Sequence, residues 1–245
     1  KTLDIAMING QVDIAVHSMK DVPTALPIGI VQAAVLERAN TLDILVHKGN
    51  LDFLNGEGTI ATGSLRRQAQ WLNKYPNHKV VDLRGNVNTR MQKLQDSNWS
   101  GAVFAAAGLE RINLKPSHYI NLDWMIPAPA QGAMVIVAMA NDDFCRDAVA
   151  ELNDIETEVC THIERQFLKT LEGGCTAPIG ALAIIQEDEI VFSGVLFSLD
   201  GKEKIEVNKI VPLEEWKKLG FIAAKEILDN GGVSLMERIR KDLKK

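Results

Sequence analysis

Short apolar runs that end in polar residues recur through the first half of the chain. Small and β-branched residues fill four of them, at 13–16, 59–62, 79–83 and 101–105. Runs of this length and composition are typical of buried strands. A helix is expected after each of the last three, at about 64–74, 87–94 and 109–112. Strands that alternate with helices indicate an α/β architecture with parallel-rich sheets.

Two segments interrupt this alternation. Apolar patterning lapses around 37–42, and two prolines punctuate 127–133. We interpret both segments as crossings, so that the chain leaves one α/β lobe, builds a second and returns through a strand at 135–138. The expected first domain is therefore 1–37 with 132–150, and the expected second domain is 41–128.

The last third of the chain has a different pattern. A long amphipathic segment at 154–171 predicts a helix, and Asp200-Gly201 is a hairpin turn signal. Antiparallel strands are expected at 181–185, 189–197 and 204–207, and helices at 216–228 and 235–243. This pattern predicts a separate C-terminal α+β domain over 154–245.

Composition indicates an ordinary globular protein. Apolar residues make up 46% and charged residues 24%, no run of about 18 apolar residues predicts a membrane helix, and the start of the chain lacks the apolar core of a signal peptide. The net charge of −5 argues against nucleic-acid binding. Three cysteines without a CxxC pair support neither a disulfide framework nor a metal site, and reduced thiols indicate the cytoplasm.

Cys175 stands apart from Cys145 and Cys160, which lie in predicted helices and are expected to be structural. It follows Gly173 and Gly174, which leave room for a large group to approach the sulfur. A lone accessible thiol in such a loop indicates a covalent attachment point or a nucleophile. The alternative is a buried cysteine that packs as a small hydrophobic residue.

Basic residues concentrate in one stretch of this acidic chain. Between 62 and 91 there are six basic residues and one acidic residue, so this stretch carries +5 and the remainder −10. Ser64 is expected to cap a helix whose first turn holds Arg66 and Arg67. Arg84 and Arg90 belong to the start of the next helix. Because helix N-termini and arginines both favour anions, the stretch predicts a site for a ligand with several carboxylates or phosphates.

The alternative is a solvated helix face whose cations pair with surface acids. We expect this alternative for Lys74 and Lys79, but not for Arg66 and Arg84, because acids are scarce nearby in the sequence.

A second polar group follows the first predicted strand. Asp21 lies after 14–18, at the carboxyl end of a strand, where open α/β sheets bind ligands. Its carboxylate could act as an acid, as a base or as a partner for a developing cation. His17 is expected to be packed or hydrogen-bonded, and Ser18 lacks a paired base.

Six ordered motifs resemble the porphobilinogen deaminase family. They lie at 13–23, 62–68, 83–90, 105–111, 129–133 and 171–175. The resemblance implies two lobes like those of type II periplasmic binding proteins and a third domain with a dipyrromethane cofactor in thioether linkage to Cys175. It implies an enzyme of haem biosynthesis, a monomer, that condenses four porphobilinogen molecules into hydroxymethylbilane and releases ammonia. Family members begin with a further segment, so the first domain is expected to be incomplete at its N-terminus.

The resemblance also implies roles for single residues. Asp21 would be the catalytic carboxylate, in contact with the cofactor. The residues that would hold the carboxylates of the cofactor are Lys20, Ser64, Arg66, Arg67 and Arg90. Those that would engage the substrate or the growing chain are Ser18, Arg84 and Arg111, with Gln131 near the hinge.

A different class of function also fits a two-lobed chain with a basic stretch. A non-catalytic small-anion binding protein is the alternative, since fold does not fix function. A third domain with a glycine-flanked thiol argues against it. A phosphate-ester enzyme is a more distant alternative, because the chain has no P-loop and no GxGxxG motif.

Overall fold

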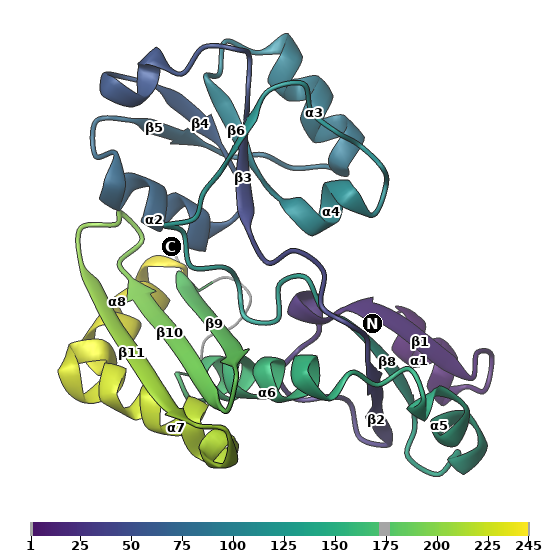
Figure 1. The fold of residues 1–245 in the computed structure, drawn as a ribbon. Coiled ribbons are helices and arrows are strands. Elements are labelled where there is room, and N and C mark those ends of the chain that lie inside the picture. The colour runs from purple at the N-terminus through teal and green to yellow at the C-terminus, as the bar shows by residue number, and fades with distance from the viewer. Residues whose placement is uncertain (1, 172–176, 245) are drawn as a thin grey trace.

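The computed structural model describes residues 2–171 and 177–244 and arranges them around three sheets. Figure 1 shows a first lobe that contains the N-terminus, a second lobe above it and a C-terminal domain beside them. Between its elements the described chain forms short turns of 3-10 and π type, which are η1 (Met19–Asp21), η2 (Asp52–Asn55), η3 (Leu213–Glu215) and η4 (Leu228–Gly232).

The first lobe is built on a three-stranded sheet in the order β1-β8-β2. Its strands are β1 (Ile14–Ser18), β8 (Met134–Met139) and β2 (Ile30–Val35), and its helices are α1 (Thr2–Ile8) and α5 (Asp143–Ala150). β8 pairs antiparallel with both neighbours, whereas the sequence pattern predicts parallel pairing. The difference arises because β8 returns from the second lobe and fits between two strands that run in the opposite direction.

The second lobe contains a five-stranded sheet in the order β5-β4-β6-β3-β7. β4 runs parallel to β5 and β6, as predicted, and β3 runs antiparallel to β6 and β7. The strands are β3 (Asp43–His47), β4 (Thr59–Ala61), β5 (Lys79–Val81), β6 (Gly101–Ala105) and β7 (Tyr119–Asn121). The helices are α2 (Leu65–Lys74), α3 (Val87–Asp96) and α4 (Ala106–Glu110).

Capping residues fix where α2 and α3 begin. Ser64 Oγ accepts a hydrogen bond from the N–H of Arg67, and Asn86 Oδ1 accepts one from the N–H of Thr89. Each cap satisfies an N–H that the helix leaves free and is worth about 1 kcal/mol. A Cβ on Gly63 would lie 2.6 Å from the carbonyl oxygen of Leu83. This glycine therefore lets the start of α2 lie directly against the turn that leads from β5 to α3.

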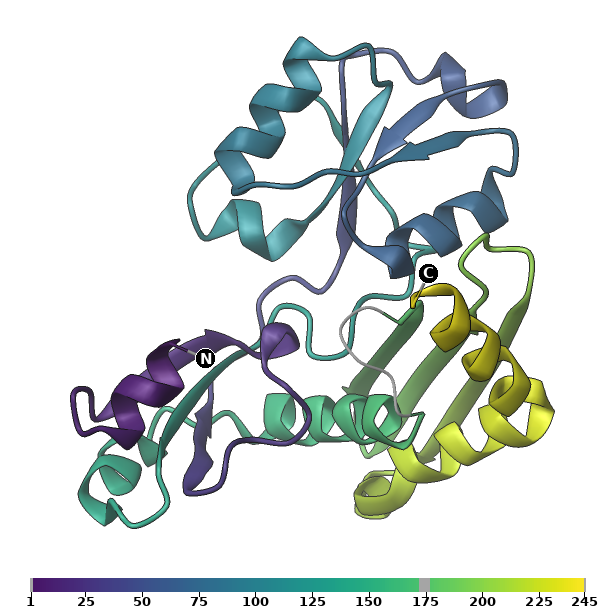
Figure 2. The same cartoon turned by 180° about the vertical axis from the view of Figure 1, so that it is seen from behind.

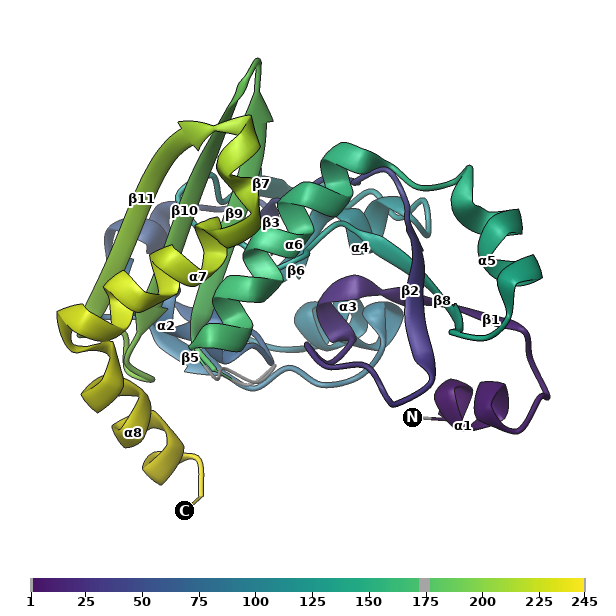
Figure 3. The same ribbon diagram turned by 90° about the horizontal axis from the view of Figure 1, so that it is seen from below.

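The C-terminal domain is an antiparallel sheet with helices on one face (Figures 2 and 3). Its elements are α6 (Ile155–Thr170), β9 (Ile179–Gln186), β10 (Glu189–Phe197), β11 (Lys204–Pro212), α7 (Trp216–Ile227) and α8 (Val233–Asp242). Ile163 and Phe167 of α6 pack on Phe192 of β10 in the core. The sheet also contacts the second lobe, because Val195 and Phe197 pack against Ala69 of α2.

The elements follow the sequence patterns closely where the pattern is long. The helices predicted at 64–74, 87–94 and 154–171 are confirmed, and so are the three strands of the C-terminal domain. The short helix predicted at 109–112 instead occupies α4, because Ala106 and Leu109 are both drawn into the core of the second lobe. The sequence patterns did not indicate α1, β2, β3 or β7, whereas the helix expected around Cys145 is confirmed as α5.

The two crossings lie side by side between the lobes. The first joins Val35 to Asp43 and the second joins Asn121 to Met134. The N–H of Ala39 bonds the carbonyl of Gly132 at 3.2 Å. Gly132 has a φ of +88°, and a Cβ there would lie 2.4 Å from the carbonyl oxygen of Ala39. The close approach of the two segments therefore depends on glycine at this position.

Glu164 of α6 ties both crossings to the C-terminal domain. Its fully buried carboxylate accepts hydrogen bonds from Arg38 Nη1 at 2.7 Å and Nη2 at 2.9 Å. It also accepts from the N–H groups of Ala130 at 2.7 Å and Ala183 at 2.8 Å. Burial alone would lower the pKa of Arg38, but Glu164 raises it above its ordinary value. All three parts of the molecule therefore meet at one carboxylate.

Replacing this carboxylate by an amide tests how much the junction depends on its charge. Glu164→Gln leaves Arg38 buried without its partner and directs an amide group at N–H donors. We expect a loss of about 3–5 kcal/mol in the free energy of unfolding, measured in urea. Glu156→Gln, on an exposed side chain of the same helix, should change it by less than about 0.5 kcal/mol. Equal stability of the two variants would contradict the assignment.

Candidate active site

Most of the predicted site residues come together where the two lobes face each other. Ser18 ends β1, and Lys20 and Asp21 form the η1 turn that follows it. The charge of Lys20 interacts with those of Asp21, Asp43, Arg66 and Arg67. The charge of Arg90 interacts with those of Arg67, Arg84 and Asp21. The strand end of the first lobe therefore lies against the two arginine-bearing helix starts of the second.

Asp43, which no sequence pattern indicated as a site residue, is at the centre of this group. It is fully buried at the start of β3. Arg67 donates to Asp43 Oδ1 from Nη2 at 2.7 Å and from Nε at 3.0 Å. Arg66 Nη2 lies 2.8 Å from Asp43 Oδ2. Burial alone would raise the pKa of Asp43, but Arg66, Arg67 and Gln131 hold it at about 2.

The alternative of a solvated cation paired with a surface acid does not apply to Arg66, as expected, but it describes Arg84, for which the expectation is wrong. Arg66 pairs with Asp43, and Arg84 Nε lies 3.0 Å from Asp82 Oδ2. A count of nearby acids missed Asp43 because it arrives from another strand. The two pairs differ in kind, since the first is buried and the Arg84 side chain is 73% exposed. An exposed pair of this sort contributes little and exchanges easily with a ligand.

Gln131 links the two lobes within this network. Its amide nitrogen donates to the carbonyl of Thr41 at 2.8 Å and to Asp43 Oδ1 at 3.0 Å. Its amide oxygen faces Lys20 Nζ at 3.5 Å. Gln131 is fully buried in the second crossing, so it joins the η1 turn of the first lobe to the start of β3 in the second. The place near a hinge that was expected for Gln131 stays a prediction.

The network carries more positive than negative charge. Burial, and then the positive charge of Arg67, lower the pKa of Lys20 to about 8. Burial, followed by Arg67 and Arg84, also lowers the pKa of Arg90. Cations that lower one another's pKa in this way are stabilised when an anion binds near them. The donor set therefore fits a ligand with several carboxylates.

The other predicted residues occupy less central positions. Arg111 follows α4 and donates from Nη2 to the carbonyl of Gly132 in the second crossing, at 2.7 Å. Arg90 Nε donates to the carbonyl of Gly85 at 2.7 Å. Ser18 is half-buried at the end of β1. Cys175 lies outside the described residues, between the end of α6 at Thr170 and the start of β9 at Ile179.

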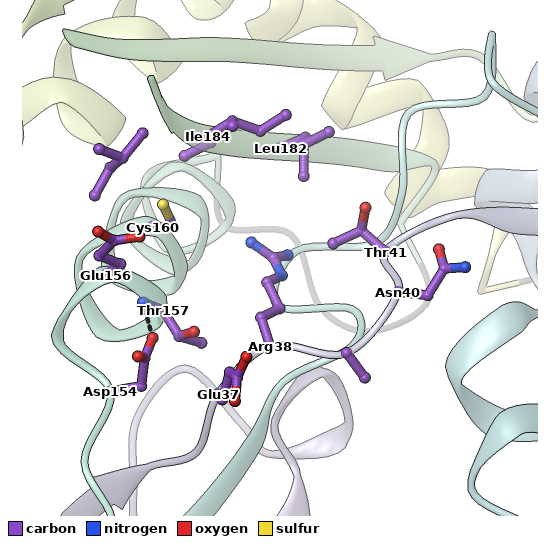
Figure 4. A pocket seen from close by; sticks show the side chains of 13 residues that line it. Glu37, Arg38, Asn40, Thr41, Asp154, Glu156, Thr157, Cys160, Leu182 and Ile184 are labelled. Carbon is purple, nitrogen blue, oxygen red and sulfur yellow. Dashed lines mark hydrogen bonds between the residues drawn. The ribbon is translucent and has the colours of Figure 1, made fainter. Parts of the chain in front are cut away.

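A pocket of about 500 Å³ lies behind the first crossing, between it, α6 and β9 (Figure 4). Arg38 points into this region between Thr157 and Thr41. None of the predicted site residues lines it. Burial, and then Glu164, raise the pKa of Cys160 at its wall to about 11. This thiol stays protonated at neutral pH, in agreement with the structural role expected of it.

The described part of the chain contains neither a membrane-spanning helix nor a metal-binding cluster. No helix there is long and apolar enough to cross a membrane. Histidine, cysteine and acidic side chains do not gather there in groups of three or more that could hold a metal ion.

Comparisons with known proteins identify the family of the chain. Residues 1–147 match the family "Porphobilinogen deaminase, dipyromethane cofactor binding domain" and residues 158–229 match "Porphobilinogen deaminase, C-terminal domain". A porphobilinogen deaminase of Geobacillus sp. (strain WCH70) is 37% identical over 99% of this chain and 79% of its own length. One of Desulfitobacterium hafniense (strain DSM 10664 / DCB-2) is 38% identical over 100% of this chain and 80% of its own length.

Solved structures show a weaker similarity. A crystal structure of the VFT2 domain of Bordetella pertussis BvgS is 16% identical and covers 64% of this chain and 68% of its own, with a TM-score of 0.39. The sequence matches extend over both lobes and most of the C-terminal domain, and they show that the chain belongs to the porphobilinogen deaminase family.

Proposed function

We propose that the protein is a porphobilinogen deaminase, also called hydroxymethylbilane synthase. Four porphobilinogen molecules and one water yield one hydroxymethylbilane and four ammonia molecules. The observation that carries the proposal is the convergence of Lys20, Asp21 and the arginines of two helix starts in a chain of this family. Cytoplasmic location and a monomeric state belong to the same proposal. The three cysteines show no disulfide framework, which supports the cytoplasmic location, and the family resemblance supports the monomeric state.

The charge of the substrate explains the cations. Each porphobilinogen carries an acetate and a propionate, so a growing chain gains two negative charges at every addition. Arginine forms paired hydrogen bonds with carboxylates. Arg84 is exposed and Arg90 is half-buried, so both can contact a ligand that changes. Lys20 of the first lobe and the hydroxyl of Ser64, at the start of α2 in the second, complete the set of donors.

Asp21 is the carboxylate that we assign to catalysis. Its side chain is exposed in the η1 turn and lies within the field of Lys20 and Arg90. Positive charge develops on the substrate pyrrole as ammonia leaves. A carboxylate beside the ring nitrogen stabilises that charge and accepts a hydrogen bond from the ring N–H. Buried Asp43 cannot take this role, because its oxygens are engaged by Arg66, Arg67 and Gln131.

The family's dipyromethane group, when bound, supplies the acceptor end for the first substrate. Its carboxylates fit the donor set of Lys20, Ser64, Arg66, Arg67 and Arg90. Cys175, in the Gly-Gly-Cys motif, is the proposed point of attachment. The guanidinium groups of Arg66 and Arg67 already bind Asp43, so they contribute a fixed net positive charge. Lys20 and Arg90 have more freedom to reach the ligand.

Intact mass and ammonia release together test the function. We expect the denatured protein to carry added mass at Cys175 that Cys175→Ser lacks and that Cys145→Ser keeps. Asp21→Asn should lower kcat at least ~100-fold, because a neutral amide does not stabilise the developing cation. Fully active protein with an unmodified Cys175 would contradict the cofactor assignment, and normal turnover of Asp21→Asn would contradict the role of that residue.

The pH dependence of turnover tests Lys20. Its pKa is about 8 without ligand, and a bound carboxylate raises it. In the active protein the attached carboxylates would contact Lys20, so it should lose this charge at a pH above 8, and kcat/KM for porphobilinogen should then fall by up to about tenfold per pH unit. Lys20→Arg keeps its charge throughout this range, so its profile should stay flatter between pH 8 and 10. Identical profiles for the two proteins would contradict the assignment.

The buried and exposed arginines should respond differently to substitution. Arg67→Gln removes two hydrogen bonds to Asp43 and one to Val103. We expect it to lower the free energy of unfolding by roughly 2–4 kcal/mol. Arg90→Gln should cost under about 1 kcal/mol, yet raise KM for porphobilinogen. Urea unfolding and steady-state kinetics measure both, and equal losses of stability would contradict the distinction.

A further inference from the structure

Arg165 of α6 binds the loop that carries Asp21. Its Nη1 donates to the carbonyl of Met19 at 3.0 Å and to the carbonyl of Val22 at 3.0 Å. Its Nη2 donates to the carbonyl of Pro23 at 2.6 Å. These three acceptors enclose Asp21 on both sides along the chain. One half-buried guanidinium of the C-terminal domain therefore fixes a turn of the first lobe.

The same loop also has attachments within the first lobe and to the second crossing, where Lys20 Nζ faces Gln131 Oε1 at 3.5 Å. The N–H of Met19 bonds the carbonyl of Ala133, and Met19 is buried in the core of the first lobe. The N–H of Val22 bonds the carbonyl of Met19, which closes the turn. Asp21 itself is exposed. The core of the first lobe therefore holds the turn through Met19 and the partly buried Val22, while Arg165 binds the backbone carbonyls on both sides of Asp21.

The helix that supplies Arg165 is itself held firmly. Glu164, the preceding residue, is buried between the two crossings and β9. Adjacent residues on a helix point about 100° apart. Glu164 can therefore contact the crossings from one face of α6, while Arg165 contacts the loop from the adjacent face. Figure 3 shows α6 running between the C-terminal sheet and the first lobe. Cys175 follows Arg165 by ten positions in the sequence.

We propose that Arg165 is a positioning residue that fixes Asp21 relative to the helix leading to Cys175. This inference rests on the proposed function. A charge-stabilising carboxylate works only when it is held in place, and small displacements are costly in rate. Because the catalytic residue and the attachment point belong to different domains, a direct bond between those domains is the contact that sets their separation.

The decisive variant is Arg165→Gln, compared with Arg165→Lys and with Arg146→Gln. Arg146 is a matched control, because its Nη1 donates to the carbonyl of Ala140 and pairs with Asp143 on the surface of the first lobe. Three readouts are needed: kcat and KM for porphobilinogen, the thermal midpoint, and hydrogen–deuterium exchange of the amides at 18–24.

For Arg165→Gln we expect a 10- to 100-fold lower kcat, a KM within threefold of the parent, and faster exchange confined to 18–24. Arg165→Lys keeps the charge and part of the donor set, so it should recover part of kcat and of the exchange protection. Arg146→Gln should match the parent in all three readouts. Unchanged kcat in Arg165→Gln overturns the proposal, as does unchanged exchange at 18–24.

If Arg165→Gln does not fold, Arg165→Lys decides: a lower kcat with faster loop exchange supports the proposal, and parental values overturn it.

The result is separable from the proposed function. A parent protein that releases no ammonia from porphobilinogen refutes the function. An active parent whose Asp21→Asn variant is inactive, together with a fully active Arg165→Gln, refutes only the positioning role.

Discussion

A single buried carboxylate allows this chain to concentrate positive charge between its lobes. Two adjacent arginines, Arg66 and Arg67, are buried in the first turn of α2, where the free N–H groups of the helix already favour anions. Without Asp43 the desolvation of both guanidinium groups would be uncompensated. One carboxylate for two cations leaves a net charge of +1 fixed at the site. Asp43 also begins β3 directly after the first crossing, so the electrostatic centre lies where this crossing enters the second lobe.

Helix α6 joins that structure to the C-terminal domain through two consecutive residues. Glu164 holds both crossings, and Arg165 holds the turn that bears Asp21. The hairpin after β10 adds a contact with α2, where Asn73 Nδ2 donates to the carbonyl of Gly201 at 2.7 Å. A Cβ on Gly201 would lie 2.3 Å from the carbonyl oxygen of Ala69. The C-terminal domain therefore contacts the first lobe, the second lobe and the crossings at separate points.

Local patterns predicted most of the helices, the strands of the C-terminal domain and the cap at Ser64, because those features depend on neighbours in the sequence. Ser64 and its first-turn arginines are a clear example. Asp43 and Glu164 could not be found this way. Each stands in an ordinary strand or helix, and only its distant partners give it a role. The antiparallel place of β8 was missed for the same reason, since the direction of a returning strand depends on the path through the second lobe. The lapse of pattern at 37–42 was a usable signal for the crossing, but it did not point to Asp43 at its end.

The division between buried and exposed arginines suits a site whose contents change. A group that stays attached can be held by cations whose geometry is fixed in advance, and Arg67 is fixed by bonds to Asp43 and Val103. A chain that lengthens must leave its contacts and form new ones. Contacts with exposed cations such as Arg84 are screened by water and individually weak, so they can exchange without a large barrier. On the proposed function, Asp21 must then stay still while the chain moves past it. Its turn is accordingly fastened to buried structure at Met19, and through Arg165 to the helix that leads to the attachment loop.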